Sequence, residues 1–411
     1  MHSDRAVAPA GSTPSPPRSN PFGHAMLAHW PLDPTCLYLN HGTVGVTPRR
    51  VLDAQQAIRD EIERQPSRFM LRELTALDMG ARHPGPPRMR AAAEVVGAFV
   101  GTRGDDLAFV DNATTGMNAV LRSLTLRSGD EILLTDLGYG AVANIARFVA
   151  RERGAGVKTV EIPYPLHDPG EVASAIAAAI GPRTRVVVVD HITSETALLL
   201  PLAEIAARCR ARGVPVLVDG AHAPGAIALD IPALGVDWYV ANLHKWAWVP
   251  RSSGILWAPL GRQAGLHPPV ISWGLDQGFT AEFDLVGTRD PSAHLAAPAA
   301  IAFLRELGFD AVRAHNHGLA WSAAGLLAGR WGTTLGMPES MVATMATVPL
   351  PERLGAARED AARLRDALLF EDRIEVPVFA ARGRLWLRVS AQVYNELSDY
   401  ERLAEAVARR A

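Results

Sequence analysis

The chain has 411 residues, of which 48 % are hydrophobic and 20 % are charged, and its formal net charge is −2. This length suits two or three domains, and the near-neutral charge balance gives no sign of a surface for nucleic acid or for an anionic membrane. No apolar run approaches the roughly 18 residues that span a bilayer, and two cysteines are too few for a disulfide framework.

The N-terminal segment has the composition of a tail. Residues 1–21 are rich in Pro, Ser, Ala and Gly and lack the apolar stretch of a signal peptide, so we expect a disordered tail on a cytoplasmic protein. Residues 22–47, which include Tyr-Leu-Asn-His-Gly at Tyr38–Gly42, are predicted to form an N-terminal arm that packs between two domains.

From residue 48 the chain alternates between helical and strand-like patterns. Predicted helices cover 51–65, 88–101, 117–126, 141–153, 173–180 and 202–212, and predicted strands cover 107–110, 131–135, 158–162, 185–190 and 215–219. Uninterrupted apolar runs such as 186–189 are typical of a parallel sheet covered by helices on both faces. Residues 48–300 are therefore predicted to form a large α/β domain with a doubly wound sheet.

After about residue 300 the pattern changes. Predicted helices cover 300–307, 318–329 and 398–410, and predicted strands cover 341–350, 374–380 and 385–390. This mixture predicts a smaller α+β domain over residues 301–411.

Lys158 and Lys245 are the only lysines, and their settings differ. Lys158 follows a glycine-containing turn and is interpreted as surface charge. Lys245 follows an apolar strand-like stretch and stands next to His244. Burial beside an imidazole can lower the pKa of an amine and make it a Schiff-base nucleophile. A lysine whose stem lies along aromatic neighbours is the structural alternative.

Three polar clusters fall near the ends of apolar segments. Asn-Ala-Thr-Thr-Gly at 112–116 joins a strand to a helix, where backbone N–H groups and hydroxyls bind phosphate or cap the helix. Asp219 ends an apolar strand, where a carboxylate needs a cationic partner such as a protonated pyridine nitrogen, unless it only caps the next turn. Gly-Thr-Arg-Asp at 287–290 is a polar turn that could reach a phosphate or lie on the surface.

Seven motifs in this order resemble the class V aminotransferase family of fold type I pyridoxal-phosphate (PLP) enzymes, in its isopenicillin N epimerase-like branch. They are LNHGTVG (39–45), RFMLREL (68–74), NATTG (112–116), VDGAH (218–222), NLHKW (242–246), GTRD (287–290) and LRVSAQVYN (387–395). The resemblance implies a mostly parallel doubly wound sheet, a PLP cofactor and a homodimer with its sites at the subunit interface.

The resemblance also implies residue roles. Lys245 would hold the cofactor covalently and carry the Cα proton, and Asp219 would keep the pyridine nitrogen protonated. Ser194 and His222 would lie near the phenolic oxygen, although desulfurase relatives usually have Asn where Ser194 stands. Tyr139 would stack on the ring. The phosphate ligands would be Thr114, Thr115, Asn242, His244 and, from the second subunit, Thr288. The substrate would meet Arg388, Asn40 and His41. No metal ligand set is predicted.

The reaction is narrowed by what the chain lacks. Cysteine desulfurases of this group carry a mobile-loop cysteine upstream of the carboxylate-binding arginine, and residues 379–387 contain none. Persulfide-forming desulfuration is therefore not predicted. No G-x-G-x-x-G or Walker A loop indicates a nucleotide-binding enzyme instead.

Three reactions at Cα remain. β-Elimination from an S-substituted cysteine needs only Lys245 as a base. Epimerisation needs a second acid/base group, for which Tyr139 is the candidate. Decarboxylation, with or without oxidative deamination, would use Arg388 to orient the carboxylate. One-base chemistry requires the fewest residues, so we predict a C–S lyase for an S-conjugated cysteine of a natural-product pathway. A catalytically inactive binding protein is least favoured, because Lys245 and Asp219 are both present.

Overall fold

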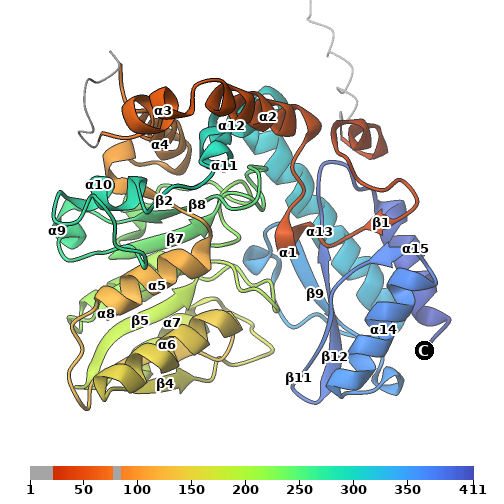
Figure 1. Cartoon of the computed structure of the whole chain (residues 1–411). Coiled ribbons are helices and arrows are strands. Elements are labelled where there is room, and N and C mark those ends of the chain that lie inside the picture. The colour runs from red at the N-terminus through yellow and green to blue at the C-terminus, as the bar shows by residue number, and fades with distance from the viewer. Residues whose placement is uncertain (1–21, 77–84) are drawn as a thin grey trace, which may run out of the picture.

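The computed structural model describes residues 22–76 and 85–411, so the predicted disordered tail lies outside the described residues. Seven strands form the central sheet in the order β2-β8-β7-β6-β5-β3-β4 (Figure 1). Neighbours from β4 to β7 run parallel, whereas β8 is antiparallel to both β7 and β2. The strands are β2 (Leu107–Val110), β3 (Glu131–Thr135), β4 (Gly156–Val160), β5 (Thr184–Asp190), β6 (Val216–Asp219), β7 (Trp238–Asn242) and β8 (Gly254–Trp257). The predicted α/β class with a mostly parallel sheet is confirmed.

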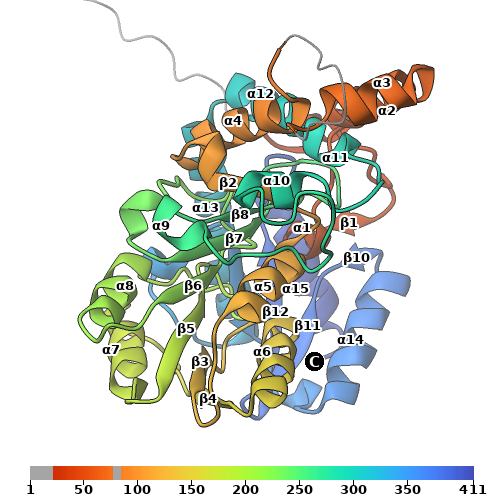
Figure 2. The same cartoon turned by 60° about the vertical axis from the view of Figure 1, so that its left-hand side comes forward.

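Helices cover both faces of this sheet, as Figure 2 shows. The helices α5 (Ala113–Ser123) and α6 (Gly140–Arg153) lie on one side, and α7 (Gly170–Ala179) and α8 (Leu202–Arg210) lie on the other. The buried strand β5 divides its side chains between two apolar clusters, because successive residues of a strand point to opposite faces. Val186 and Val188 join one cluster and Val187 and Val189 join the other.

Further helices pack around the large unit, and many of them lie near β2, the edge strand of the central sheet (Figure 1). They are α2 (Arg49–Arg64), α3 (Pro66–Arg68), α4 (Arg88–Val100), α9 (Leu260–Gln263), α10 (Phe279–Asp284), α11 (Ser292–Leu295) and α12 (Ala297–Leu307). A five-residue π-helix, Phe69–Glu73, follows α3.

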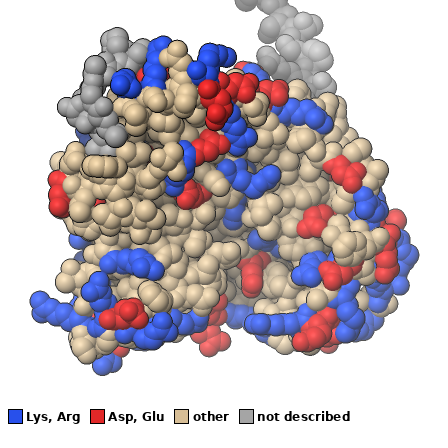
Figure 3. All heavy atoms as spheres, viewed as in Figure 1, with Lys and Arg blue, Asp and Glu red and all other residues tan. Residues whose placement is uncertain are grey.

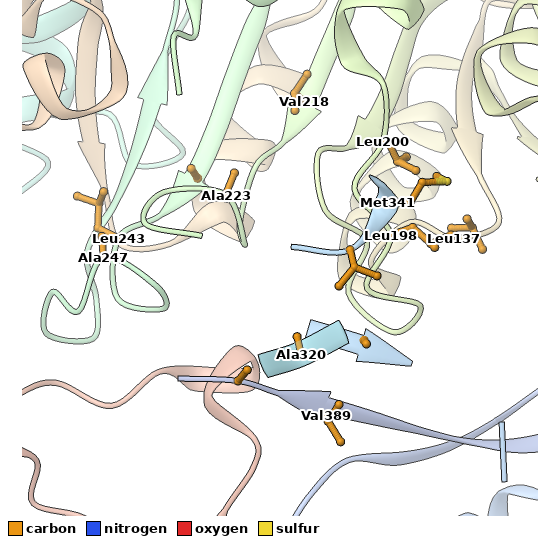
Figure 4. Packing of buried hydrophobic residues seen from close by; sticks show 14 of the residues in the cluster. Leu137, Leu198, Leu200, Val218, Ala223, Leu243, Ala247, Ala320, Met341 and Val389 are labelled. Carbon is orange, nitrogen blue, oxygen red and sulfur yellow. The ribbon is translucent and has the colours of Figure 1, made fainter. Parts of the chain in front are cut away.

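The smaller unit is built on an antiparallel sheet of order β11-β12-β9. Its strands are β9 (Met345–Pro349), β11 (Val378–Ala381) and β12 (Arg384–Ser390), and its helices are α13 (Phe309–Trp331), α14 (Arg358–Phe370) and α15 (Leu397–Ala408). One apolar cluster runs through both units, since Val218 and Ala223 of the large unit belong to it together with Ala320 and Val389 of the small one (Figure 4). The two units therefore share a packed interior.

The N-terminal arm touches both units. Its strand β1 (Leu37–Tyr38) pairs in parallel with β10 (Ile374–Glu375), next to the small sheet. The short helix α1 (His41–Val44) ends at Gly45, which has φ 68°. A Cβ at Gly45 would lie 1.9 Å from the backbone oxygen of His244, so only glycine fits this close approach to the Lys245 loop.

Several element boundaries differ from the sequence prediction. The helix expected at 117–126 begins at Ala113, because the side chain of Asn112 accepts a hydrogen bond from the Thr115 N–H and caps the helix. The helix expected at 318–329 is the middle of the 23-residue α13. The strand expected at 374–380 is divided into β10 and β11 on either side of Pro377, which has no N–H for a strand ladder.

Charges of both signs are interspersed on the face shown in Figure 3. Within the described ranges, no helix has the length and apolarity to cross a membrane.

Candidate active site

A cavity of about 380 Å³ lies where the carboxyl ends of β5, β6 and β7 meet the N-terminal arm and β12. Ligands gather at this edge in open α/β sheets. The cavity collects nine of the residues that the sequence analysis singled out, although they are spread over more than 250 positions. These are Thr114, Tyr139, Ser194, Asp219, His222, Asn242, His244, Lys245 and Arg388.

The Lys245 amine is almost fully buried in this cavity, with 9 % of the residue exposed. Burial and the nearby Arg388 guanidinium lower the pKa of Lys245 to about 7, while the carboxylates of Asp219 and Asp190 act in the opposite direction. At neutral pH a large share of Lys245 is therefore the free amine, which is the form that attacks an aldehyde.

His222 holds the amine in place. Its Nε2 lies 3.0 Å from Lys245 Nζ, and the indole N–H of Trp246 donates to its Nδ1 at 3.5 Å. An indole N–H is only a donor, so Nδ1 is an acceptor and the proton of the neutral ring is on Nε2. Burial, with the positive charges nearby, lowers the pKa of His222 well below its usual value, which keeps the ring neutral. His222 thus donates Nε2–H to the lone pair of the uncharged Lys245 amine.

Asp219 ends β6 with its carboxylate in the cavity. Among the described residues, its side chain has one hydrogen bond, accepted by Oδ1 from the Ala221 N–H at 3.0 Å. The ring of Tyr239 packs against Gly220, the residue after Asp219. A Cβ on Gly220 would come within 2.4 Å of the Tyr239 hydroxyl oxygen. Burial raises the pKa of Asp219, and the charge of Lys245 opposes that rise. A buried carboxylate with a free oxygen suits a protonated ring nitrogen.

The N-terminus of α5 forms the polar wall opposite. Asn242 Oδ1 accepts the Ala113 N–H at 2.8 Å, and Asn112 accepts the Thr115 N–H at 3.0 Å. Asn112, Ala113 and Thr114 line the cavity, and the N–H and hydroxyl of Thr114, which no other described residue engages, are the donors that this helix end leaves free.

His244 also lines this wall, and its Nδ1 lies 3.2 Å from the Ser253 backbone oxygen. A carbonyl oxygen only accepts, so Nδ1 carries the proton and Nε2 of the neutral ring is an acceptor. Burial lowers the pKa of His244 to about 4. Nε2 of this neutral ring can accept a hydrogen bond from a protonated phosphate oxygen at this wall.

Arg388 is a buried cation that forms no ion pair within the described residues, although the negative charge of Glu195 acts on it. Its guanidinium donates to the Ser194 backbone oxygen, to Thr43 Oγ1 at 2.7 Å and to Asn40 Oδ1 at 3.5 Å. None of the ion pairs among the described residues includes it, and its Nε has no hydrogen-bond partner there. Burial lowers the pKa of Arg388 to about 10, so it stays charged at neutral pH. A substrate carboxylate would supply the ion-pair partner that the Arg388 guanidinium lacks.

Four predicted residues do not line the cavity of this chain: Asn40, His41, Thr115 and Thr288. Asn40 donates to Glu375 Oε1 at 2.7 Å and accepts from Arg388, so it supports the guanidinium. His41 lies behind Lys245 and contacts its backbone. Thr115 packs on Asn112 at the helix cap. Thr288 is exposed in the turn after α10 and does not line this cavity, although its neighbour Arg289 is paired with the lining residue Asp111 at 2.6 Å.

The cavity also contains groups that the sequence analysis did not assign. Thr43 and Val44 come from the arm, Asp111, Arg251 and Ser252 lie near the helix end, and Asp190 ends β5 beside Asp219. Asp190 had a usable signal, because it ends an apolar strand in the same way as Asp219. Thr43 and Val44 belong to the short helix α1, and Asp111, Arg251 and Ser252 stand in irregular segments whose path the sequence pattern does not fix.

The donor set fits PLP. The cavity offers a buried amine with a lowered pKa, a carboxylate with an unpartnered oxygen, a helix N-terminus with free donors and a buried cation for a carboxylate. These are the groups that would meet an aldehyde, a pyridine nitrogen, a phosphate and an amino-acid substrate, respectively.

Comparisons with known proteins agree with this fit. The family model described as aminotransferase class-V matches residues 47–366. Isopenicillin N epimerase of Streptomyces clavuligerus is 36 % identical over an alignment of 394 residues that covers 92 % of this chain and 95 % of that protein. A probable chloroplastic L-cysteine desulfhydrase of Arabidopsis thaliana is 32 % identical over 91 % of this chain and 83 % of its own length. The cysteine desulfurase CsdA of Escherichia coli has the same fold, with a TM-score of 0.73, 21 % identity, and coverage of 95 % of this chain and 98 % of that one.

Proposed function

This chain belongs to the class-V aminotransferase family of PLP enzymes, and we propose that it is a C–S lyase that cleaves cysteine or an S-substituted cysteine. The cofactor is pyridoxal 5′-phosphate, which when bound withdraws electrons from Cα of an amino acid. Two relatives are named L-cysteine desulfhydrase and isopenicillin N epimerase, so elimination and epimerisation are the two reactions that we compare.

The observation that carries the proposal is that the cavity contains one buried amine, which can take a proton, and one buried guanidinium, which can bind a substrate carboxylate. Among the described residues that line the cavity, Lys245 is the single buried amine. Arg388 is a buried cation there that forms no ion pair with a carboxylate. Elimination needs a base on one face only, so this set is sufficient for it.

The chain's residues would divide the work as follows. Arg388 binds the α-carboxylate through its planar guanidinium. Lys245 Nζ removes the Cα proton with the lone pair that otherwise accepts the His222 N–H, and the Cβ–S bond then breaks. The sulfur leaves with a proton as the thiol, or as hydrogen sulfide from cysteine. Water hydrolyses the remaining three-carbon enamine, so the products are thiol, pyruvate and ammonia.

The positions of the cysteines argue against a persulfide mechanism. Cys209 is fully buried in α8 and Cys36 lies in the arm, and neither lines the cavity. The hairpin that joins β11 to β12 has only Arg382 and Gly383 between its strands. Such a tight turn has no room for the long mobile loop that brings a cysteine to the substrate.

Epimerisation is the second candidate, and Tyr139 favours it. This tyrosine lines the cavity at the start of α6 and is 48 % exposed, so its phenol is free to exchange protons with solvent. The 36 % identity to isopenicillin N epimerase adds to this alternative. A two-base epimerase would need Tyr139 to return the proton on the face opposite Lys245.

We also infer a homodimer in which Thr288 of the partner subunit completes the phosphate wall. Thr288 is exposed and does not line the cavity of its own chain, and an apolar stretch that precedes α10 in the chain is also exposed. This stretch includes Val270 at 57 %, Ile271 at 52 % and Trp273 at 75 % exposure. Exposed apolar groups of this size mark protein contacts.

One product assay separates the reactions. Purified enzyme is incubated in deuterium oxide with L-cysteine and with a series of S-substituted cysteines, the kind of conjugate that a natural-product pathway would supply. Thiol, pyruvate and ammonia are expected in equal amounts, and all three should vanish in Lys245→Ala. Deuterium at Cα with inversion and without pyruvate would establish the epimerase instead. Carbon dioxide would indicate decarboxylation, and persulfide lost in a variant without Cys36 and Cys209 would overturn the exclusion of desulfuration.

A further inference from the structure

A carboxylate of the small unit is connected to the Arg388 guanidinium through a single amide. Glu375 is the second residue of β10, which lies beside the arm strand β1 (Figure 2). Its Oε1 accepts a hydrogen bond from Asn40 Nδ2 at 2.7 Å, and Asn40 Oδ1 accepts from the Arg388 guanidinium at 3.5 Å. Within the described ranges, the bond to Asn40 is the only hydrogen bond of the Glu375 side chain.

Thr43 adds a second path from Asn40 to the guanidinium. The Thr43 hydroxyl accepts from Arg388 Nη2 at 2.7 Å and donates to Asn40 Oδ1. The same Nη2 makes the 3.5 Å bond to Asn40 Oδ1. The three side chains therefore form a closed set of hydrogen bonds, in which the Asn40 oxygen accepts twice.

The orientation of the Asn40 amide decides whether this set can form. A carboxylate only accepts, so Glu375 requires the Nδ2 side of the amide and leaves Oδ1 towards Arg388. With the amide turned over, its NH₂ group would face the guanidinium, and two donors would meet without an acceptor. The Thr43 hydroxyl can donate or accept, so it does not select the orientation. Glu375 is the one partner of Nδ2 among the described residues.

The amide also separates two opposite charges. A carboxylate in direct contact with Arg388 would occupy the guanidinium and compete with the carboxylate of a substrate. Asn40 is neutral, and a hydrogen bond to Glu375 polarises its amide so that Oδ1 becomes a stronger acceptor. Arg388 is thus held by a neutral oxygen, and its charge is left for the substrate.

We propose that Glu375 is a positioning residue for the substrate-carboxylate site, which acts by fixing the Asn40 amide so that its oxygen holds the Arg388 guanidinium. This inference rests on the part of the proposed function that assigns the substrate carboxylate to Arg388. It applies equally to elimination and to epimerisation, because both begin with the binding of an amino acid.

The competing view is that Glu375 only fastens the arm to β10. Backbone groups already do this, since β1 pairs with β10 and the Leu39 N–H donates to the Glu375 carbonyl oxygen at 3.0 Å. The ion pair between Asp33 and Arg373, at 2.9 Å, joins the same two segments and does not include Asn40. Asp33→Asn is therefore the matched control for a loosened arm.

The first measurement is the affinity of the PLP-loaded protein for L-alanine and for ethylamine, followed by the visible absorbance of bound PLP. The two probes differ only in the carboxylate, and neither has a leaving group on Cβ, so no lyase activity is required. Glu375→Ala should raise the dissociation constant of L-alanine about 3- to 10-fold, the worth of one hydrogen bond, and leave that of ethylamine unchanged. Glu375→Gln, whose amide oxygen can still accept from Asn40, should restore most of the affinity, and Asp33→Asn should change neither constant. Equal losses for both probes, or no loss for L-alanine, would overturn the proposal.

The second measurement is a double-mutant cycle with the same probes. Asn40→Ala should weaken L-alanine binding, and Glu375→Ala added to it should cause little further loss, because Glu375 acts only through the amide. Additive losses would show that Glu375 acts independently of Asn40 and would reject the assignment.

Arg388→Met separates this inference from the proposed function. It should abolish the preference for L-alanine over ethylamine. If the preference survives in Arg388→Met, the substrate carboxylate does not bind there, and the proposed function loses its anchor together with this inference. If the preference is lost in Arg388→Met but is unaffected by Glu375→Ala, the role of Glu375 alone is wrong.

Discussion

The His41 ring holds the backbone at Lys245: its Nε2–H donates to the Lys245 carbonyl oxygen at 3.0 Å. Its Nδ1 accepts from the Tyr394 hydroxyl at 2.9 Å, so the ring links the arm, the lysine loop and the segment between β12 and α15. Burial lowers the pKa of His41 to about 4, which keeps the ring neutral and both bonds intact at neutral pH. Together with Gly45 against His244, this fixes the point from which the lysine side chain extends.

Replacement of His41 should therefore weaken cofactor retention. His41→Phe keeps an aromatic ring but leaves the Lys245 carbonyl and the Tyr394 hydroxyl without partners, at a cost of about 1–3 kcal/mol each in unfolding free energy. We expect a lower melting temperature of the apoprotein and a higher PLP dissociation constant. Tyr394→Phe, which keeps the bond to Lys245, should have the smaller effect on PLP. If KM for the substrate rose while PLP affinity stayed unchanged, His41 would be a substrate ligand after all.

The lowered pKa of Lys245 predicts how PLP loading depends on pH. Only the neutral amine attacks the aldehyde, so the rate at which apoprotein binds PLP covalently should rise with pH through about 7 and then level off. Arg388→Met removes a positive charge that lowers this pKa, so its midpoint should move to higher pH. Arg388→Lys keeps a charge there and should move it less. Stopped-flow absorbance measures the rate, and equal midpoints for Met and Lys would refute the electrostatic link.

The sequence predicted the fold well because its signals were local and repeated. Apolar strands such as 186–189 and the helices between them required the same parallel sheet, and the structure agrees. The antiparallel strand β8 was missed, since Gly254–Trp257 is short and follows an irregular loop. β8 pairs with both β7 and β2. The residues that pair β8 with β2 are more than 140 positions apart in the chain, and no local sequence pattern encodes such a pairing.

The site was predicted in part for a similar reason. Asp219 is the last residue of β6 and Lys245 follows the end of β7 by three residues, and both therefore lie at the edge of the sheet where ligands bind. Asn40 and His41 lie in the arm, where the resemblance supplied the residues but not their orientation. Both turned out to contact other protein groups, Arg388 and the Lys245 backbone, because the arm packs its polar side chains inward. Asp190 had the same strand-end signal as Asp219 and was overlooked.

The tautomer of His222 gives a test of the Trp246 contact. Trp246→Phe keeps an aromatic ring in the buried position but removes the N–H that donates to Nδ1 at 3.5 Å. The proton of His222 is then no longer confined to Nε2, and part of the population should carry it on Nδ1. Nitrogen-15 NMR of labelled histidine distinguishes the two tautomers. At a pH well above 7, where Lys245 is uncharged, the wild type should show protonated Nε2 alone, and a wild-type ring with protonated Nδ1 at that pH would contradict the assigned hydrogen-bond direction.

A subunit-mixing experiment tests the contribution of Thr288. Lys245→Ala should lack activity in both of its sites, and Thr288→Ala should load PLP poorly, because each site would lose a phosphate donor from the partner. In a hybrid dimer, one site combines both substitutions, and the other has Lys245 from one subunit and Thr288 from the other. Mixing the two variants after reversible dissociation should therefore restore activity at limiting PLP. Ser in place of Thr288 keeps the hydroxyl and should load normally. If mixing restores nothing while each variant still forms dimers, Thr288 does not act across the interface.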